Sequence, residues 1–465
     1  MTIQGTPGPD RLVGTSGADV LTGLGGADRL DGLAGADFLD GGDGRDTVVG
    51  GPGDDRIAAE EDGAKDSISC GAGRDTVTAE LADQVAADCE TVGRQLSRDP
   101  FEGYDGQHET EVEPDSFAWG STIVTVFQVG RSSNAGAVVN GFATSRDAGK
   151  SWRAGLLPSF TFASTPSGPF QGASDPTVGY DARHNVWLAT SIGFSLGAGT
   201  AVAVSRSRDG FVWTTPVTAV PAGPESPDKE WIACDNWSTS PLRGTCYLAY
   251  YDLVRGVIAV RSSKDGGATW SSAVPTPSLG RVDAIVNGAQ PVVRKDGTLV
   301  VLFSVFESTL EGVDEIAAVR STDGGSTFGQ PVRVSELDDE AVLGLRIPPF
   351  VSAEVAADGT IWAAWSDCRF RLECDQNDIV LTSSRNGVAW TRPVHVPTVD
   401  ATAPIASVLP GLGVDPASSG THTASASSTT RCRRRAVAAW SSAAESTSSS
   451  SAPRMPAAPG RSRCA

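Results

Sequence analysis

The chain has 465 residues, too many for one ordinary core, and 40% of them are apolar, enough to build two or more domains. Of its net charge of −19, residues 1–95 carry −12, with 19 acidic against 7 basic residues. An acidic block of this kind argues against nucleic acid and anionic membranes as partners, and it favours cations. No run of 18 apolar residues occurs, so the sequence predicts no membrane span.

The first predicted element is a nine-residue repeat that starts at Gly5. Each repeat has a glycine turn, then an Asp, then an aliphatic residue two positions later. The aspartates, spaced nine residues apart, are Asp10, Asp19, Asp28, Asp37, Asp46 and Asp55. The pattern G-G-x-G-x-D-x-U-x resembles the RTX calcium repeats of the parallel β-roll.

Nine residues make one tight turn and one very short strand, so two repeats complete a coil. Asp10, Asp28 and Asp46 then share one row of turns, with neighbours about 4.8 Å apart. Carboxylates this close repel one another, and a hard cation with about 6 to 8 oxygen ligands relieves the repulsion. We therefore predict Ca²⁺ as the cofactor, bound by the aspartates and by turn carbonyls. The predicted carbonyl ligands lie in the turns of Gly14, Gly23, Gly32, Gly41 and Gly50.

The alternative for this segment is an acidic, flexible, glycine-rich linker. A linker would not keep an aliphatic residue at every second position after Asp. After Asp55 the register slips, since Asp66 follows eleven residues later and Asp75 nine after that. We expect the extra residues to break the ladder and to make Asp66 and Asp75 weaker ligands. A Cys70–Cys89 bridge would cap the roll, which we place at residues 1–92, followed by a linker at 93–108.

A second motif occurs five times, from a serine to an aromatic residue. Its copies are Ser145–Trp152, Ser207–Trp213, Ser263–Trp270, Ser321–Phe328 and Ser384–Trp390. The starting serines are 62, 56, 58 and 63 residues apart, which indicates repeated supersecondary units. Each copy lies between two strand-like segments and fits a hairpin turn. The structural acid or amide positions of the turns are Asp147, Asp209, Asp265, Asp323 and Asn386.

This motif resembles the Asp box, S-x-D-x-G-x-T-W, of sialidases and other BNR-repeat β-propellers. The resemblance implies a six-bladed propeller in which each box lies on the outside of its blade, away from the central site. Five full blades and the start of a sixth fit within residues 109–416. The predicted fold class is therefore all-β, with an N-terminal parallel β-roll and a sialidase-like six-bladed propeller whose sixth blade is incomplete.

The pattern stops beyond Pro416. Residues 417–465 hold 13 serines and seven arginines and no strand-like run, so we expect a disordered tail or the product of a frameshift. A ring that stops inside blade six would be open and poorly stable.

The cysteines fall into local couples without zinc-type spacing. Three couples could form disulfides or stay as free buried thiols: Cys70 with Cys89, Cys234 with Cys246, and Cys368 with Cys374. Cys432 and Cys464 form a further couple in the tail. Disulfides would place the protein outside the cell or at its surface. Residues 1–14 show no signal-peptide pattern, so the export route stays open.

The resemblance also implies a type of chemistry. Sialidases use an arginine triad, an Asp acid/base and a Tyr nucleophile paired with Glu. No arginine or tyrosine here matches the family positions, so no role is carried over. Acids that begin innermost strands are Glu111, Asp175, Asp228, Glu230, Asp235 and Glu354, with Arg346, Arg369 and Arg371 as anion partners. Each could equally be a strand-end or surface charge.

The segment from Asp228 to Asp235 is the best catalytic candidate, because three carboxylates crowd around Lys229 and could shift one another's pKa. Asp175 and Arg346 complete the catalytic candidates. Two functions stay open: an exported sialidase-type glycoside hydrolase joined to a calcium module, or a noncatalytic propeller that binds glycans, sialoglycoconjugates or proteins at the cell surface. We expect a monomer, and we expect the chain as written to lack sialidase activity.

Overall fold

The computed structural model describes most of the chain. The described residues are 1–59, 63–101, 106–132, 136–195, 199–281, 284–307, 314–339, 348–397, 405–414, 424–433 and 463–464. Within these ranges the fold is almost wholly β, with one short 3-10 turn, η1 (Leu372–Cys374). None of the helical structure in these ranges has the length and hydrophobicity to cross a bilayer. Two compact units form, Met1–Ser174 with Gly210–Trp213, and Asp175–Asp209 with Thr214–Ala465.

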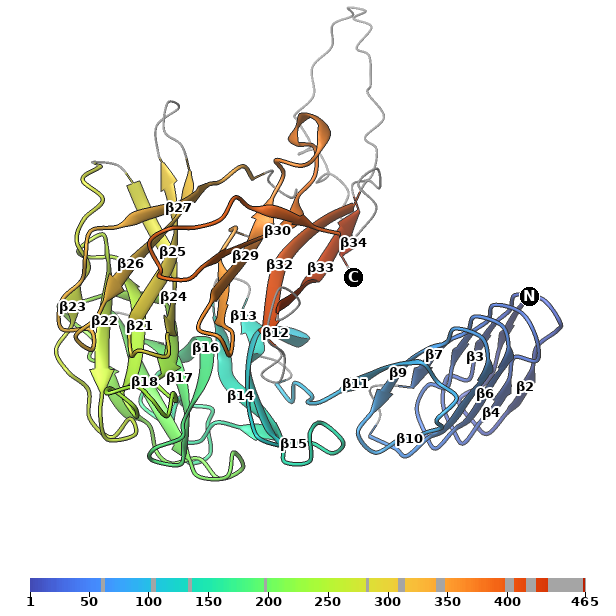
Figure 1. Ribbon diagram of the computed structural model, residues 1–465. Helices are drawn as coiled ribbons and strands as arrows, with labels where there is room; N and C mark the ends of the chain where they lie inside the picture. The colour runs from blue at the N-terminus through green and yellow to red at the C-terminus, as the bar shows by residue number, and fades with distance from the viewer. Residues whose placement is uncertain are drawn as a thin grey trace, which may run out of the picture. The chain divides into compact units, whose positions relative to one another are not determined.

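The first part of the chain is a parallel β-roll of short strands (Figure 1). Its strands are β1 (Thr2–Gln4), β2 (Arg11–Val13), β3 (Val20–Thr22), β4 (Arg29–Asp31), β5 (Phe38–Asp40), β6 (Thr47–Pro52), β7 (Arg56–Ala59), β8 (Ser67–Ala72), β9 (Thr76–Glu80), β10 (Gln84–Val85) and β11 (Thr91–Gln95). Odd-numbered strands form one sheet and even-numbered strands the other. One coil therefore takes two repeats, as the nine-residue period predicts.

The core of the roll is a column of aliphatic side chains. Each short strand points its central residue inward, so that Leu21, Leu30, Leu39, Val48 and Ile57 are fully buried. Leu21 pairs with Leu39 and Leu39 with Ile57 in the parallel ladder. Burial of one such side chain contributes about 1.5–3 kcal/mol, so this column supplies the main apolar stabilisation of the roll.

Glycine is required where successive coils cross. Gly35 has a φ of 127°, and a Cβ on it would lie 2.6 Å from the carbonyl carbon of Gly17 in the coil before. A side chain there would meet both an unfavourable φ and a backbone clash. The glycine pattern in the sequence thus reflects how closely the coils stack.

From β12 onward the sheets are antiparallel and are built from consecutive strands, an arrangement consistent with a propeller-like domain. We name the strand groups blades one to five. Blade one has β12 (Gly106–Trp119), β13 (Thr122–Ser132), β14 (Ala137–Ser145) and β15 (Arg153–Leu156); blade two has β16 (Gly172–Asp181), β17 (Val186–Ser195), β18 (Gly199–Ser207) and β19 (Val217–Val220). One residue pair, Ala137 with Ala173, joins these two blades into one sheet.

The next three blades are separate four-stranded sheets. Blade three has β20 (Pro227–Cys234), β21 (Cys246–Asp252), β22 (Val257–Ser263) and β23 (Val274–Pro275); blade four has β24 (Ala284–Val293), β25 (Leu299–Glu307), β26 (Glu315–Ser321) and β27 (Val332–Glu336); blade five has β28 (Ser352–Val355), β29 (Ile361–Asp367), β30 (Asp378–Ser384) and β31 (Val394–Val396).

Blades three, four and five pack face to face. Tyr247 of blade three and Phe303 of blade four share one core cluster. Leu302 of blade four and Trp365 of blade five share the next. The middle strands are therefore buried on both faces, and β21 is buried along its whole length.

A further sheet follows, with β32 (Ile405–Val414), β33 (Ala424–Arg433) and β34 (Arg463–Cys464). The prediction that no strand follows residue 416 is wrong for β33, which pairs with β32 along its length. The unpaired backbone groups of a strand edge can bind any extended segment, whatever its side chains, so side-chain pattern misses such a strand. The rest of the predicted tail lies outside the described residues.

The predicted linker at 93–108 also differs from the structure at both ends. Strand β11 runs to Gln95 and pairs with β9 of the roll, and β12 already begins at Gly106. Backbone pairing extends both elements past the point where their side-chain pattern fades.

Candidate functional site

The aspartates of the roll form two rows that are tied together through the backbone. In each row the N–H of one Asp donates to Oδ1 of the Asp one coil later; Asp19 N to Asp37 Oδ1 measures 2.8 Å, and Asp37 N to Asp55 Oδ1 measures 2.9 Å. The other row repeats the contact from Asp10 to Asp28. One carboxylate oxygen of each Asp is thereby satisfied.

The second oxygen of several of these carboxylates is buried without a hydrogen-bond donor. This holds for Oδ2 of Asp28, Asp37, Asp55 and Asp75. These side chains belong to residues that are 1–3% exposed. A buried, charged oxygen without a partner destabilises the fold. These oxygens therefore need a donor or a positive charge that the described residues do not supply.

Backbone carbonyls converge on the same place. A Cβ on Gly32 would lie 2.6 Å from Asp37 Oδ2 and 2.6 Å from the carbonyl oxygen of Gly50, one coil later. Glycine therefore keeps open a space that is bordered by a carboxylate and a carbonyl. The same arrangement occurs at Gly5, Gly14, Gly23 and Gly50, and Gly41 adjoins Asp46 Oδ2. Hard oxygen ligands of both kinds are those that Ca²⁺ prefers.

The rows concentrate negative charge. Burial raises the pKa of Asp55 to about 6, and the charges of Asp37 and Asp75 add to this effect. Burial also raises the pKa of Asp37. At the end of its row, the N-terminal ammonium group lowers the pKa of Asp19 by donating to it. A cation bound between the coils would lower the pKa of the inner aspartates, as the ammonium group lowers that of Asp19.

The expected break in the ladder after Asp55 is wrong. Asp46 N donates to Asp66 Oδ1 and Asp55 N to Asp75 Oδ1, both at 2.8 Å, and β6 pairs with β8 at an offset of 20 residues. Two residues added within one turn lengthen that coil from 18 to 20 residues, which shifts both rows equally and leaves the strands in register. Asp66 and Asp75 are therefore full members of their rows.

The rows even continue past the last predicted ligand. Asp66 N donates to Asp83 Oδ1 and Asp75 N to Glu90 Oε2, each at 2.9 Å. A signal existed in the sequence, because Asp83 and Glu90 are each followed two residues later by valine. The spacing of Asp83 and Glu90 departs from the nine-residue period, so the period does not reveal them.

The end of the roll is closed by a second acid and a disulfide. Asp88 accepts hydrogen bonds from Ser69 Oγ (3.0 Å) and from the N–H of Gly71 (3.1 Å), which lowers its pKa. The adjacent Cys89 is bonded to Cys70, with 5.2 Å between their Cα atoms. This segment covers the last coil, where the predicted cap lies.

The family model of the RTX calcium-binding nonapeptide repeat matches residues 4–39, 31–63 and 40–77. Residues 4–77 carry RTX calcium-binding repeats. Among the described residues, no three His, Cys, Asp or Glu side chains gather around one point as metal ligands. The oxygen atoms that border the glycine turns of these repeats are carboxylate and main-chain carbonyl oxygens.

No curated protein matches the chain, whereas several solved structures resemble it. The Hadza microbial sialidase Hz136 is 19% identical, with a TM-score of 0.44 over 61% of this chain and 58% of that one. The leech intramolecular trans-sialidase is 13% identical, with a TM-score of 0.47 over 70% and 66%. The α-L-arabinofuranosidase Arb93A of Fusarium graminearum is 12% identical, with a TM-score of 0.47 over 67% and 87%. The chain thus spans under two thirds of the Hadza sialidase.

Outside the RTX repeats, the predicted catalytic acids fall into one cluster and one outlier. Asp175 of β16 forms an ion pair with Lys229 of β20 at 2.5 Å. Glu230, the next residue, is 1% exposed, and the Thr190 hydroxyl donates to its Oε1 at 3.3 Å. Its Oε2 is buried without a hydrogen-bond partner. Burial raises the pKa of Glu230 well above its usual value, and the charge of Asp175 adds to the effect.

The outlier is Asp235, which we expected beside Lys229. It is fully buried at the far end of β20, where Ser240 Oγ and the N–H of Trp237 donate to its carboxylate. An extended strand rises about 3.3 Å per residue, so Lys229 and Asp235, which are six residues apart along the chain, lie far from each other. Asp235 holds a turn together, while Asp228 accepts from Asn287 Nδ2 at 3.0 Å.

Of the predicted arginine partners, the two that the structure describes bind acids of blade five instead of this cluster. Arg369 binds Asp367, and Arg371 forms a two-pronged ion pair with Asp378, with contacts of 2.7 Å from Nε and 2.6 Å from Nη2. Arg346 lies outside the described residues. Both described guanidinium groups therefore stabilise blade five from within.

Sequence reasoning missed a strained position that recurs in the innermost strands. Glu113, Asp175 and Lys229 have φ values of 53°, 44° and 46°, and Gly288 takes 69°. In β12, β20 and β24 these residues lie within irregular register shifts. Positive φ in charged, non-glycine residues is uncommon, and such strain gathers at functional sites. A carboxylate directly before proline, as at Glu113 and Asp175, is the signal in the sequence.

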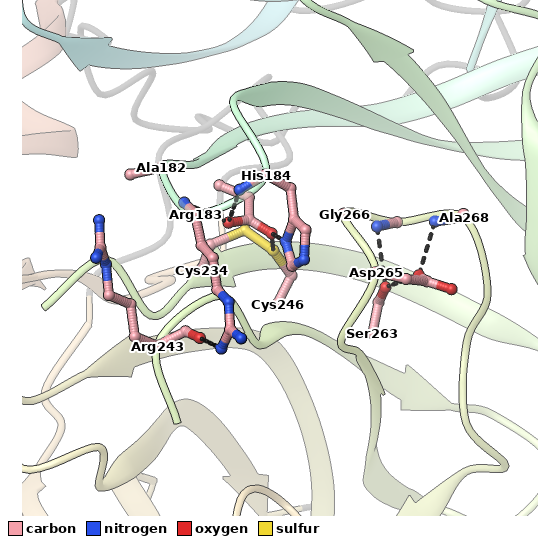
Figure 2. A network of polar contacts seen from close by, with 12 residues as sticks. Ala182, Arg183, His184, Cys234, Arg243, Cys246, Ser263, Asp265, Gly266 and Ala268 are labelled. Atoms are coloured by element: carbon pink, nitrogen blue, oxygen red, sulfur yellow. Dashed lines mark hydrogen bonds and ion pairs between the residues drawn. A yellow bond between two sulfur atoms is a disulfide. The ribbon is translucent and has the colours of Figure 1, made fainter. Parts of the chain in front are cut away.

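The Asp-box residues hold their turns together. Figure 2 shows the third box, in which Ser263 Oγ and the N–H of Ala268 donate to Asp265 Oδ1 at 2.8 and 3.0 Å. Asp147 and Asp323 make the same kind of contacts, and Asn386 accepts through Oδ1 in the fifth box. In the second box, Ser207 Oγ donates to Asp209 at 3.1 Å.

Two further disulfides lie in the blades. Cys234 and Cys246 join β20 to β21 next to the third box (Figure 2). Cys368 joins Cys374 across η1, at the end of the β29–β30 ladder opposite to the fifth box. Backbone pairing aligns Cys432 with Cys464 in the last sheet.

Proposed function

We propose that the RTX segment, residues 1–92, folds around calcium ions, and that residues 109–416 form a six-bladed, glycan-recognising propeller of an exported protein. The observation that carries the calcium proposal is the set of buried Oδ2 atoms that lack donors and border the glycine turns. RTX repeats are typical of secreted proteins, and the three disulfides suit an oxidising compartment.

The aspartates from Asp10 to Asp75 and the carbonyls of the glycine turns would hold the ions. When bound, calcium supplies positive charge that neutralises neighbouring carboxylates. The chain's own contribution is the stacking, in which the backbone fixes Oδ1 of inner aspartates such as Asp37 and leaves Oδ2 facing the turn. In the first coil Oδ2 of Asp10 and of Asp19 accepts from Thr6 and from Thr15. Folding and calcium binding are then coupled.

Isothermal titration of the full-length protein with calcium tests this proposal. We expect binding of several ions, together with protection of the RTX segment against proteolysis. Absence of binding in protein previously treated with chelator would contradict it.

For the propeller, we propose recognition of glycans without hydrolysis of sialosides. Support comes from Arg369 and Arg371, which are occupied by Asp367 and Asp378 rather than free to bind a substrate carboxylate. Lys229 and Asp175, which are partly exposed at a strained bend, are the groups best placed to meet a ligand.

A second candidate is a glycoside hydrolase, which one observation favours. Glu230 has a raised pKa and lies next to the ion pair of Asp175 and Lys229. In a pair of this kind the protonated carboxyl can act as the general acid and the ionised carboxylate as the base. Hydrolysis of a fluorogenic sialoside or arabinofuranoside that is lost in Glu230→Gln would favour this candidate, while glycan binding without hydrolysis would favour the first.

A further inference from the structure

Each Asp box after the first packs its glycine turn onto the blade before it. The glycines have φ values of 66–79° in these boxes, and in each turn one glycine lies against a side chain of the second strand of the preceding blade; Gly210 also meets Thr144, at 2.8 Å. Measured from an ideal Cβ on the glycine, the contacts are Gly210 to Val124 (3.0 Å), Gly267 to Leu188 (2.7 Å), Gly325 to Tyr247 (3.5 Å) and Gly387 to Val300 (2.7 Å). We call the receiving position of each blade its slot residue.

The slot residues are equivalent by strand register. Each pairs across the blade with the residue just before the first serine of its own blade's box. The pairs are Val124 with Thr144, Leu188 with Arg206, Tyr247 with Ser262 and Val300 with Arg320. In blade five this register pairs Trp362 with Ser383, so Trp362 is the fifth slot residue.

The fifth slot differs from the other four in exposure. Val124, Leu188, Tyr247 and Val300 are 0% exposed, whereas Trp362 is partly exposed. A groove of about 500 Å³ opens beside it, lined by Trp362, Trp390, Asp358, Ser383 and Asn386 among others. The box motif does not recur in the sequence after Trp390. Blades one to five, as described, therefore have five slots, and four boxes follow a blade along the sequence.

The filled slots also recognise the backbone of the turn. In blade one, Thr144 Oγ1 donates to the carbonyl oxygen of Gly210 at 2.7 Å. In blade two, Arg206 Nε donates to the carbonyl oxygen of Gly266 at 2.8 Å. Ser383 occupies the equivalent position in blade five. The fifth slot thus presents an aromatic ring and a hydroxyl, and in blade one a hydroxyl binds the box turn. In blade three the matching Ser262 hydroxyl lies 3.5 Å from Ser271 Oγ instead, as Ser383 Oγ lies 3.5 Å from Thr391 Oγ1.

The first box is the counterpart, because no blade precedes it along the sequence. Its glycine, Gly149, has a φ of 85°, and within 4 Å of an ideal Cβ lie Ile123 at 3.8 Å and Trp152 at 4.0 Å, both from its own blade. Arg146 and Lys150 on this turn are exposed, and so is Asp358 at the groove. The groove also holds Arg385, whose charge acts on Asp358, so it is the shape of the free turn, and not a net charge, that suits the open slot.

We propose that the open slot of blade five binds the first Asp box, Ser145–Trp152, of a second copy of this chain. The contact is head-to-tail, so it leaves one free slot and one free box at the ends of each assembly and extends with concentration. A single hairpin in a groove buries a small area, so the association is weak and appears at high protein concentration. It departs from the monomer that the sequence suggests.

A disulfide trap between two variants tests the contact. Ala148→Cys lies on the exposed turn of the first box, and Ser383→Cys lies in the groove. We expect mixed dimers when the two proteins are combined under mild oxidation. Val212→Cys replaces Ala148→Cys as the matched control, since Val212 is 71% exposed on the second box, whose turn already contacts blade one. Mixed dimers should be at least tenfold rarer with this control.

Sedimentation supplies an independent measurement. Trp362→Glu places a charge in the groove and should weaken self-association at least tenfold, whereas Val388→Glu, exposed on the fifth box but outside the groove, should leave it unchanged. An unchanged melting temperature shows that both variants fold. A monomer at every concentration would overturn the proposal. So would a disulfide inside single chains that carry both cysteines, because the chain's own hairpin would then occupy the slot.

Discussion

Asp55 in the roll and Asp323 in the fourth Asp box are both turn aspartates, yet their pKa values move in opposite directions. Burial raises the pKa of Asp55 to about 6. In the box, the hydroxyl and N–H of Thr327 donate to Asp323 and lower its pKa to about 2. The Asp box supplies its own donors, whereas the roll buries its acids without enough of them. We therefore expect the roll, and not the Asp-box turns, to need an external cation.

The largest expected effect is that of calcium removal. With chelator, the full-length protein should lose the β structure of the roll, because repulsion within the rows is no longer neutralised. Far-ultraviolet circular dichroism and limited proteolysis would measure this. Cleavage should fall within residues 1–92 and spare the blades. Identical spectra and cleavage with chelator and with millimolar calcium would show that the roll does not need calcium to fold.

Substitution of single row members should come next. Asp37→Ala removes one of the oxygen ligands and should lower calcium affinity roughly tenfold or more, as loss of a ligand commonly does. Asp75→Ala should do the same, because its row is unbroken. Asp40→Ala, at the end of β5 and outside the rows, is the matched control. If Asp75→Ala behaved like Asp40→Ala, the continuity of the ladder would have no consequence for binding.

Glu230 tests the comparison inside a blade, since it is the buried acid there that most resembles Asp55. The pKa of Glu230 is higher in the folded than in the unfolded protein. The protonated carboxyl therefore stabilises the fold below the unfolded pKa of about 4.3, and this stabilisation is lost as pH rises through the folded pKa. Glu230→Gln should therefore raise the unfolding free energy at pH 7 by about 1 kcal/mol and have little effect at pH 4. Urea unfolding at both pH values measures this, and a loss of stability at pH 7 would contradict it.

The smallest effect concerns the hydroxyl donor of an Asp box. Thr327→Val removes one donor and should raise the pKa of Asp323 from about 2. A depressed carboxyl pKa stabilises the fold above the unfolded value and is lost as pH falls. The variant should thus be less stable at pH 7 by under about 1 kcal/mol, since the turn is exposed.

Ser326→Ala is the control for that change. Ser326 Oγ donates to the backbone carbonyl of Asp323 and not to its carboxylate, so this variant should leave the carboxyl pKa unchanged. A nuclear magnetic resonance titration that gave both variants the same Asp323 pKa would show that the hydroxyl is not the cause.

By itself the sequence determined the repeating parts of this protein. The nine-residue spacing of Asp and aliphatic residues placed Leu21 and Leu39 in one sheet and Asp19 and Asp37 in one row, because short-range periodicity dictates which residues stack. The five boxes located the hairpins for the same reason. Local motifs of this kind carry their structure wherever they occur.

Only the tertiary structure decided which of these groups find partners. In the structure the Asp ladder continues past the insertion after Ala59, and Asp235 binds a turn away from Lys229. Arg371 forms an ion pair with Asp378. The structure also leaves Trp362 partly exposed where Val300 is buried. Spacing along the chain cannot reveal these outcomes, since each depends on which strand packs beside which and whether a donor from another element reaches the group.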